Sequence, residues 1–139
     1  MEVPRTPVVV WTVSLGGGLG AAARYGACRL WPDAPGSFPW TTVTVNVVGC
    51  AAMGVLMVAV AGARATHALV RPFFATGVLG GFTTFSTYVA DAQTLMSGGR
   101  PAAGLACTAG TPLVALAAAW SAARAARRLR VPGRERVRA

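Results

Sequence analysis

The third apolar segment of the chain carries a cluster of polar groups that could bind an ion. Gly80 and Gly81 fall near its centre and are followed by hydroxyl side chains at Thr83, Thr84, Ser86 and Thr87. Glycine inside a helix costs roughly 1 kcal/mol relative to alanine, so two in sequence favour a broken or unwound helix. Carbonyl groups freed there could bind a cation, whereas freed N–H groups and hydroxyls could face an anion. A close-packed helix whose hydroxyls bond to their own carbonyls is the alternative.

Polar residues of the first two apolar segments could serve the same chemistry. Asn46 lies inside the second segment, where an amide is costly in hydrocarbon unless it has a partner. It could donate to an anion or hold two helices together, and Thr42 shares its helical face. Arg24 closes the first segment, where it could face a cavity or extend to the membrane surface.

Two aromatic residues follow the glycine pair. Phe85 and Tyr88 are three residues apart, so their rings are predicted to meet on one helical face. An aromatic ring has a positive edge. Edges along a narrow track could hold a small anion weakly enough for it to leave, as conduction requires. Lipid contact or ordinary helix packing is the alternative.

A membrane fold is needed to position these residues. Hydrophobic residues make up 54% of the 139 and charged residues only 12%, against roughly 25% charged in soluble domains. The windows without charge run over 6–23, 41–63, 72–90 and 101–123, each near the roughly 20 residues of a spanning helix. They lack the alternation of barrel strands. The sequence predicts an all-α integral membrane protein of four transmembrane helices, with the third broken at mid-membrane. The spans are rich in glycine, and tight backbone packing explains most of these residues.

The placement of arginine predicts the orientation and a basic tail. All 13 basic residues are arginine. Four spans put both termini on the same side of the membrane, and that side also carries Arg5, Arg64 and Arg71. The opposite side has Arg29 and Arg100, with Arg24 near it, so the positive-inside rule places both termini in the cytoplasm. The chain therefore divides into a membrane subunit, 1–123, and an arginine-rich cytoplasmic tail, 124–139. The tail could bind nucleic acid, but it lacks interleaved aromatics and follows an apolar segment, which favours a membrane surface.

Several kinds of site are missing from the sequence. The spans contain no aspartate, glutamate or histidine, and the acids fall at ends or linkers: Glu2, Asp33, Asp91 and Glu135. A proton-coupled exporter would bury a titratable carboxylate. No nucleophile–base pair or phosphate loop is present, which predicts that the chain is not an enzyme. The cysteines are odd in number and far apart, so they predict small buried residues, not a disulfide framework or zinc site.

Together, three motifs resemble the Fluc (CrcB) family of fluoride channels. They read GLGAAARY at 18–25, TVTVNVVG at 42–49 and GGFTTFSTY at 80–88, in the order and spacing of that family. The third motif is the specific one, and the first two support it. The fourth span and the tail match the family only in general character and not in a motif.

The resemblance implies a channel subunit and a set of site residues. Family members are four-helix subunits that pair antiparallel, with dual topology, into a dimer with two pores. A structural Na⁺, which is not transported, would be held by the backbone carbonyls of Gly80 and Thr83. Fluoride would leave the cell passively across the plasma membrane, which protects against its toxicity. The residues expected along the anion path are Arg24, Thr42, Asn46, Thr84, Phe85, Ser86 and Tyr88.

Two features depart from the family pattern. The second ring is usually phenylalanine, and Tyr88 adds a hydroxyl donor and some bulk. The arginine bias commits the chain to one orientation, whereas an antiparallel homodimer needs both. The sequence therefore predicts pairing with a related subunit of opposite topology, with a homodimer as the alternative. The other functions considered are a small four-helix multidrug-type exporter and a non-transporting membrane scaffold.

Overall fold

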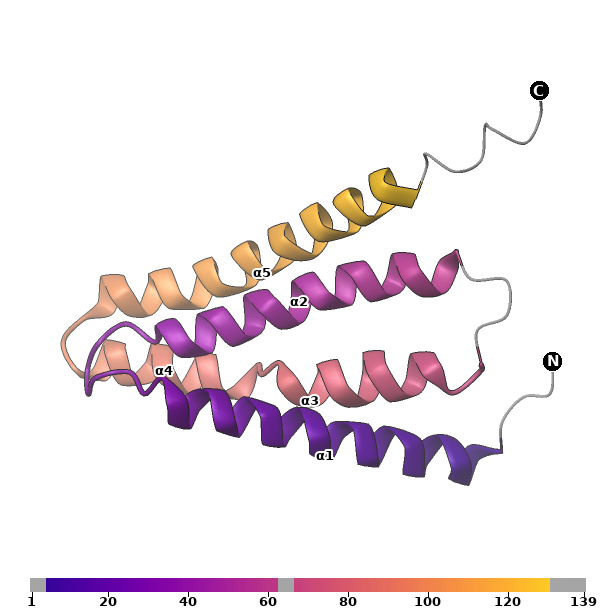
Figure 1. The fold of residues 1–139 in the computed structure, drawn as a ribbon. Coiled ribbons are helices and arrows are strands. Elements are labelled where there is room, and N and C mark those ends of the chain that lie inside the picture. The colour runs from indigo at the N-terminus through magenta and orange to yellow at the C-terminus, as the bar shows by residue number, and fades with distance from the viewer. Residues whose placement is uncertain (1–4, 63–66, 131–139) are drawn as a thin grey trace.

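The computed structural model describes residues 5–62 and 67–130, and every regular element among them is helical. Figure 1 shows α1 (Thr6–Leu30), α2 (Trp40–Ala61) and α5 (Pro101–Arg130) as long continuous helices. The third apolar segment is divided into a π-helix, η1 (Pro72–Leu79), followed by α3 (Gly80–Phe82) and α4 (Ser86–Ser97). The prediction of an all-α fold with four helical segments is confirmed.

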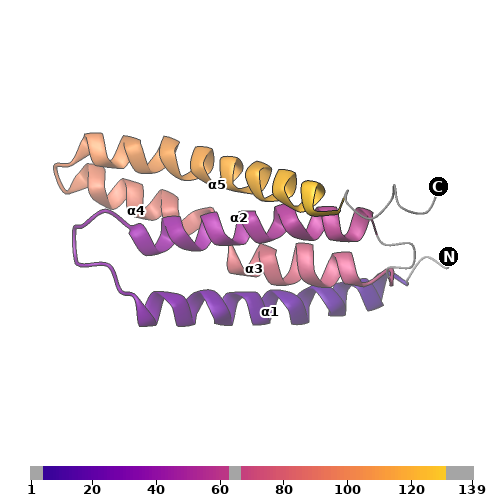
Figure 2. The ribbon, with the colours of Figure 1, turned by 45° about the horizontal axis from the view of Figure 1, so that its top comes forward.

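Three of these helices, α1, α2 and α5, are long and apolar enough to cross a membrane. They run side by side as a bundle in both views (Figures 1 and 2). The start of α1 and the ends of α2 and α5 lie together at one end, hereafter the terminal end. The α1–α2 and α4–α5 connections lie at the other end, hereafter the loop end. This arrangement is that of a multi-pass membrane protein.

The helices pack in two groups that meet around the third segment. α1 packs mainly against η1 and α3, whereas α5 packs against α2 and α4. Backbones touch in the first group: a β-carbon on Gly16 would lie 2.5 Å from the carbonyl oxygen of Phe73, and one on Gly20 would overlap that of Val78. Small residues four apart allow such close approach in lipid. Tight packing therefore explains Gly16 and Gly20, as predicted.

The third segment leaves the helical conformation later than the glycine pair predicted. Gly80 and Gly81 are both helical in α3, and the helix ends at Phe82. Thr83 is extended, with φ −75° and ψ 158°, and helix resumes at Ser86. A β-carbon on Gly81 would overlap the carbonyl oxygen of Gly17. Gly81 therefore serves close packing on α1, and the interruption falls at residues 83–85.

Two other expectations differ from the structure in part. The tail was expected to begin at residue 124, but α5 continues through Arg130; residues 131–139 lie outside the described part of the chain. All three cysteines are free. Cys107 is fully buried where α5 packs on α4, as predicted for a small buried residue. Cys28 is exposed on α1.

Candidate functional site

Asn46 joins α2 to the interruption of the third segment. Its Nδ2 donates to the carbonyl oxygen of Thr84 at 3.0 Å, and the N–H of Thr84 donates to its Oδ1 at 2.8 Å. In a continuous helix that N–H would bond the carbonyl of Gly80. Asn46 is only 6% exposed, so this reciprocal pair is shielded from solvent. Of the two roles considered for this amide, holding two elements together is the one that the geometry shows.

Arg24 of α1 caps the interruption from the opposite side. Its Nε donates to the carbonyl oxygen of Gly81 at 3.2 Å. In an unbroken helix that carbonyl would receive the N–H of Phe85. Arg24 is half-buried and makes no ion pair among residues 5–62 and 67–130. Its guanidinium therefore replaces a lost helical hydrogen bond at this carbonyl.

The carbonyls of Gly80 and Thr83 are the two named by the family resemblance for Na⁺. The N–H of Thr84, which would donate to the Gly80 carbonyl in a continuous helix, donates to Oδ1 of Asn46 instead. The N–H of Thr87, which would serve Thr83, donates to the Thr84 hydroxyl at 3.1 Å. Within the described part of the chain neither carbonyl receives a hydrogen bond. Unwound backbone carbonyls are the ligands that Na⁺ takes in transporters, so these atoms fit the ion.

The predicted ring pair meets beside this interruption. The Phe85 and Tyr88 ring centroids are 5.2 Å apart and the planes are inclined by 83°, which is an edge-to-face contact. Tyr88 is buried at 7% exposure, whereas Phe85 is 74% exposed. Both line a cavity of about 210 Å³ with Asn46, Thr83 and Thr84. The prediction that these two rings share one face is confirmed.

α5 adds one hydroxyl to this cavity that the sequence could not single out. Thr111 lines the cavity at 3% exposure, and its Oγ1 lies 3.9 Å from the sulfur of Cys107. Thr108 instead donates to the carbonyl of Gly104, within its own helix, and Ser121 is exposed. The helical period of α5 could not show which of its faces turns toward α4. Ser86, which was expected on the anion path, is exposed and does not line this cavity.

Thr42 lies one turn before Asn46 on α2 and meets a carboxylate. Its hydroxyl donates to Oδ2 of Asp91 at 2.8 Å, and Thr42 is 7% exposed. The placement of Asp91 in a linker was wrong, because α4 continues to Ser97 and includes it. Asp91 and Thr42 line a second cavity, of about 200 Å³, together with Asp33. The absence of a carboxylate therefore no longer argues against a proton-coupled exporter.

The two cavities form a polar row along α2. Thr42 belongs to the cavity at the loop end and Asn46 to the cavity at the interruption. Four residues of helix separate them by about 6 Å. Hydroxyl groups, one amide and two aromatic rings follow this row, and the carboxylates of Asp33 and Asp91 line its cavity at the loop end. The hydroxyls and ring edges at the interruption are weak donors, which suit the transient binding of a small anion better than its tight capture.

The chain is similar to known proteins over most of its length. The family model described as CrcB-like protein, Camphor Resistance (CrcB) matches residues 11–123. A relative from Streptomyces coelicolor named fluoride-specific ion channel FluC 1 is 61% identical over 125 residues, which cover 90% of this chain and 80% of the relative. Fluoride-specific ion channel FluC 2 of Streptomyces avermitilis is 59% identical over 107 residues, covering 77% and 67%. Fluoride-specific ion channel FluC 2 of Nocardia farcinica is 53% identical over 114 residues, covering 82% and 81%. The matched region includes all three motifs between residues 18 and 88, and the chain belongs to the CrcB family.

Proposed function

We propose that this chain is a subunit of a fluoride-specific ion channel, not an enzyme, that lets fluoride leave the cytoplasm passively and so limits its toxicity. The observation that carries this proposal is the 61% identity, over 90% of the chain, to a relative named fluoride-specific ion channel FluC 1. The polar row from Thr42 through Asn46 to the ring pair supplies a path of matching chemistry. The same relatives argue against the exporter and scaffold alternatives.

The path would bind fluoride through several weak contacts. The hydroxyl of Thr111 and the edges of Phe85 and Tyr88 are groups that can face a dehydrated anion. The hydroxyls of Thr42 and Thr84 would join them on turning away from Asp91 and Thr87, to which they donate. Arg24 and Asn46 would act mainly by holding the interruption in place, because their donors contact its backbone. Several shallow sites let an ion enter and still leave, which passive conduction requires.

A structural Na⁺ would be held by the carbonyls of Gly80 and Thr83. Both carbonyls lack their helical hydrogen-bond donors, and Gly80 is exposed, so a cation could also reach matching carbonyls of a second subunit. The interruption lies near the middle of the membrane in this proposal. Its support is the packing of Gly81 on Gly17, close to the midpoint of α1. The ion would fix the subunits and would not be transported.

The assembly would be an antiparallel dimer in the plasma membrane, with both termini of this chain in the cytoplasm. The terminal end carries Arg5, Arg71, Arg127 and further arginines of α5, whereas the loop end carries Arg29 and Arg100 beside Asp33 and Asp91. This bias opposes insertion in two orientations. A related subunit of opposite topology would complete the dimer and balance the charge across the membrane.

Fluoride efflux from liposomes tests the function and the assembly together. We expect purified chain to release fluoride, with chloride retained, only when it is reconstituted with an opposite-topology relative. Efflux from the chain alone would support the channel and overturn the heterodimer. The absence of fluoride efflux from both preparations, with insertion verified, would contradict the channel. A host lacking the gene should become sensitive to fluoride; sensitivity to cationic drugs instead would favour the exporter.

The hydroxyl of Tyr88 is expected to be dispensable. It makes no hydrogen bond within residues 5–62 and 67–130, whereas its ring contacts Phe85 edge to face. Tyr88→Phe therefore keeps the ring edge, and we expect fluoride flux in liposomes to be unchanged or raised. Tyr88→Ala removes the edge as well and should lower the flux by about tenfold or more. A large loss of flux in Tyr88→Phe would show that the hydroxyl takes part in conduction.

A further inference from the structure

An apolar groove opens between α2 and α5 at the terminal end of the bundle. Its volume is about 740 Å³, within the range of ligand-binding pockets. The two helices touch where a β-carbon on Gly54 would overlap the carbonyl oxygen of Ala119. The groove begins at this contact and is lined chiefly by Met53, Met57, Leu116, Ala119, Trp120 and Ala123. It takes no part in the polar row along α2.

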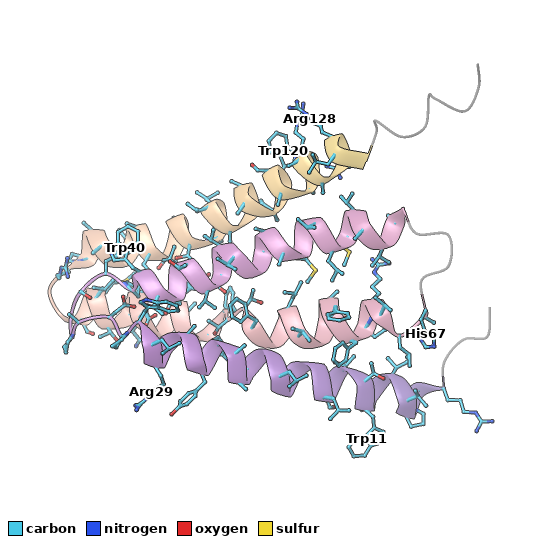
Figure 3. The ribbon with its side chains drawn as sticks, viewed as in Figure 1. Trp11, Arg29, Trp40, His67, Trp120 and Arg128 are labelled. Carbon is cyan, nitrogen blue, oxygen red and sulfur yellow. The ribbon has the colours of Figure 1, made fainter. Side chains whose placement is uncertain are left out.

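The same face of α5 changes from apolar to basic as it leaves the membrane span. Ala119, Ala123 and Arg127 recur every four residues on this face, and Arg127 itself lines the groove. The guanidinium of Arg124 lies 5.2 Å from the centre of the Trp120 ring, at the side of the groove. Figure 3 shows Trp120 and Arg128 on the C-terminal part of α5. The groove therefore has an apolar floor and a cationic rim.

Within residues 5–62 and 67–130, no acidic group lies near the groove to neutralise this rim. The acidic side chains among residues 5–62 and 67–130 are Asp33 and Asp91, and both line the cavity at the loop end. Leu116 and Trp120 are 69% and 59% exposed, so the groove is open along the lipid-facing side of α5. A ligand would need an acyl chain for the floor and a negative group for the rim.

We propose that this groove binds an anionic phospholipid, with an acyl chain along α2 and α5 and the phosphate at Arg127 and Arg124. Basic pockets between transmembrane helices are where anionic lipid head groups bind, and one arginine near the surface contributes about a fivefold change in affinity. The site is separate from the ion path and does not depend on which ion the protein conducts.

Native mass spectrometry of the delipidated full chain tests the site with two lipids of equal acyl chains. Phosphatidylglycerol should bind in preference to phosphatidylcholine, and Arg127→Gln should weaken phosphatidylglycerol binding about fivefold. Arg29→Gln removes the same charge at the loop end and should leave binding unchanged. Equal losses in the two variants, or equal binding of the two lipids, would overturn the proposal.

A second pair of variants tests the apolar floor. Ala123→Phe fills the groove and should weaken the binding of both lipids, whereas Ala117→Phe, on an exposed face of α5 outside the groove, should not. Circular dichroism confirms that each variant is folded. Displacement of the lipid by inorganic phosphate would show a bare anion site and overturn the proposal. A groove occupied by a second copy would also overturn it, and would appear as a dimer that Ala123→Phe dissociates.

Discussion

Asn46→Ala is expected to abolish most of the fluoride flux. The substitution removes both partners of the Thr84 backbone, at 2.8 and 3.0 Å, and leaves a buried N–H and a buried carbonyl unsatisfied. Each such group costs about 1–3 kcal/mol, and in lipid no water can compensate. The chain around Thr84 would rearrange and carry the Phe85 ring with it. We expect at least a roughly hundredfold loss of efflux from liposomes, since two groups at roughly 2 kcal/mol each exceed that factor.

Two further variants separate the roles of this amide. Asn46→Asp keeps the acceptor for the Thr84 N–H, but it puts a carboxylate oxygen against the Thr84 carbonyl and a negative charge beside the proposed anion path, so the flux should fall at least as far as in Asn46→Ala. Thr44→Ala changes an exposed residue of α2 that makes no contact with the interruption, and it should leave the flux unchanged. Near-normal flux in Asn46→Ala would show that the interruption is held without this side chain.

Gly20→Ala is expected to destabilise the bundle markedly. The added β-carbon would overlap the carbonyl oxygen of Val78 and lie 2.8 Å from the backbone nitrogen of Phe82. Both are backbone atoms, so no side chain can rotate away, and α1 must separate from the third segment. Overpacking of this kind costs about 1–3 kcal/mol, a large share of a marginal stability. A lower melting temperature and less monodisperse protein in size-exclusion chromatography are the expected results.

Gly18→Ala is the matched control two residues earlier on the same helix. A β-carbon there has no neighbour within 4 Å in the described part of the chain. Because alanine is the better helix former by up to about 1 kcal/mol, this variant should be as stable as the native chain or more so. Equal destabilisation by the two substitutions would mean that helix flexibility, and not the contact with Val78, is what Gly20 provides.

Both predictions rest on the same feature: α1 and α2 hold the interruption of the third segment in place. α1 approaches closely through Gly20 and caps the carbonyl of Gly81 with Arg24. α2 supplies the amide of Asn46 to the backbone of Thr84. Backbone that leaves the helix inside a membrane protein must find new partners. Here those partners come from side chains, and the carbonyls of Gly80 and Thr83, where we propose that Na⁺ binds, accept no hydrogen bond within the described part of the chain.

Much of the fold follows from local properties of the chain. Low charge and long apolar runs are sufficient to predict helices able to cross a membrane, and three helices of the structure are long and apolar enough. The three-residue spacing of Phe85 and Tyr88 is sufficient to predict their contact, because Phe85, although it precedes α4, keeps a helical backbone conformation and residues three apart in a helix share one face. The motifs between residues 18 and 88 were enough to indicate the family, which the relatives confirm.

The details of the site were decided by contacts between distant segments. The sequence marked Gly80 and Gly81 as the breaking point, but helix ends at Phe82 because Asn46, from another helix, takes the hydrogen bonds of Thr84. Helix α4 likewise runs past Asp91, whose carboxylate accepts a hydrogen bond from Thr42 on α2. The third charge-free window ends at residue 90 because Asp91 is an acid. Sequence alone could not show that Thr42, from another helix, would be its hydrogen-bond partner.

The sequence by itself determined the class of fold, the family and the set of polar residues available to the site. Only the tertiary structure decided which of them act together: Thr111 and not Thr108 reaches the cavity, and Gly20 and not Gly18 meets a neighbouring backbone. The physical reason is the range of the forces involved. Helix formation and membrane insertion depend on composition within one segment, whereas the burial, hydrogen bonding and close approach of a given residue depend on which face another helix covers.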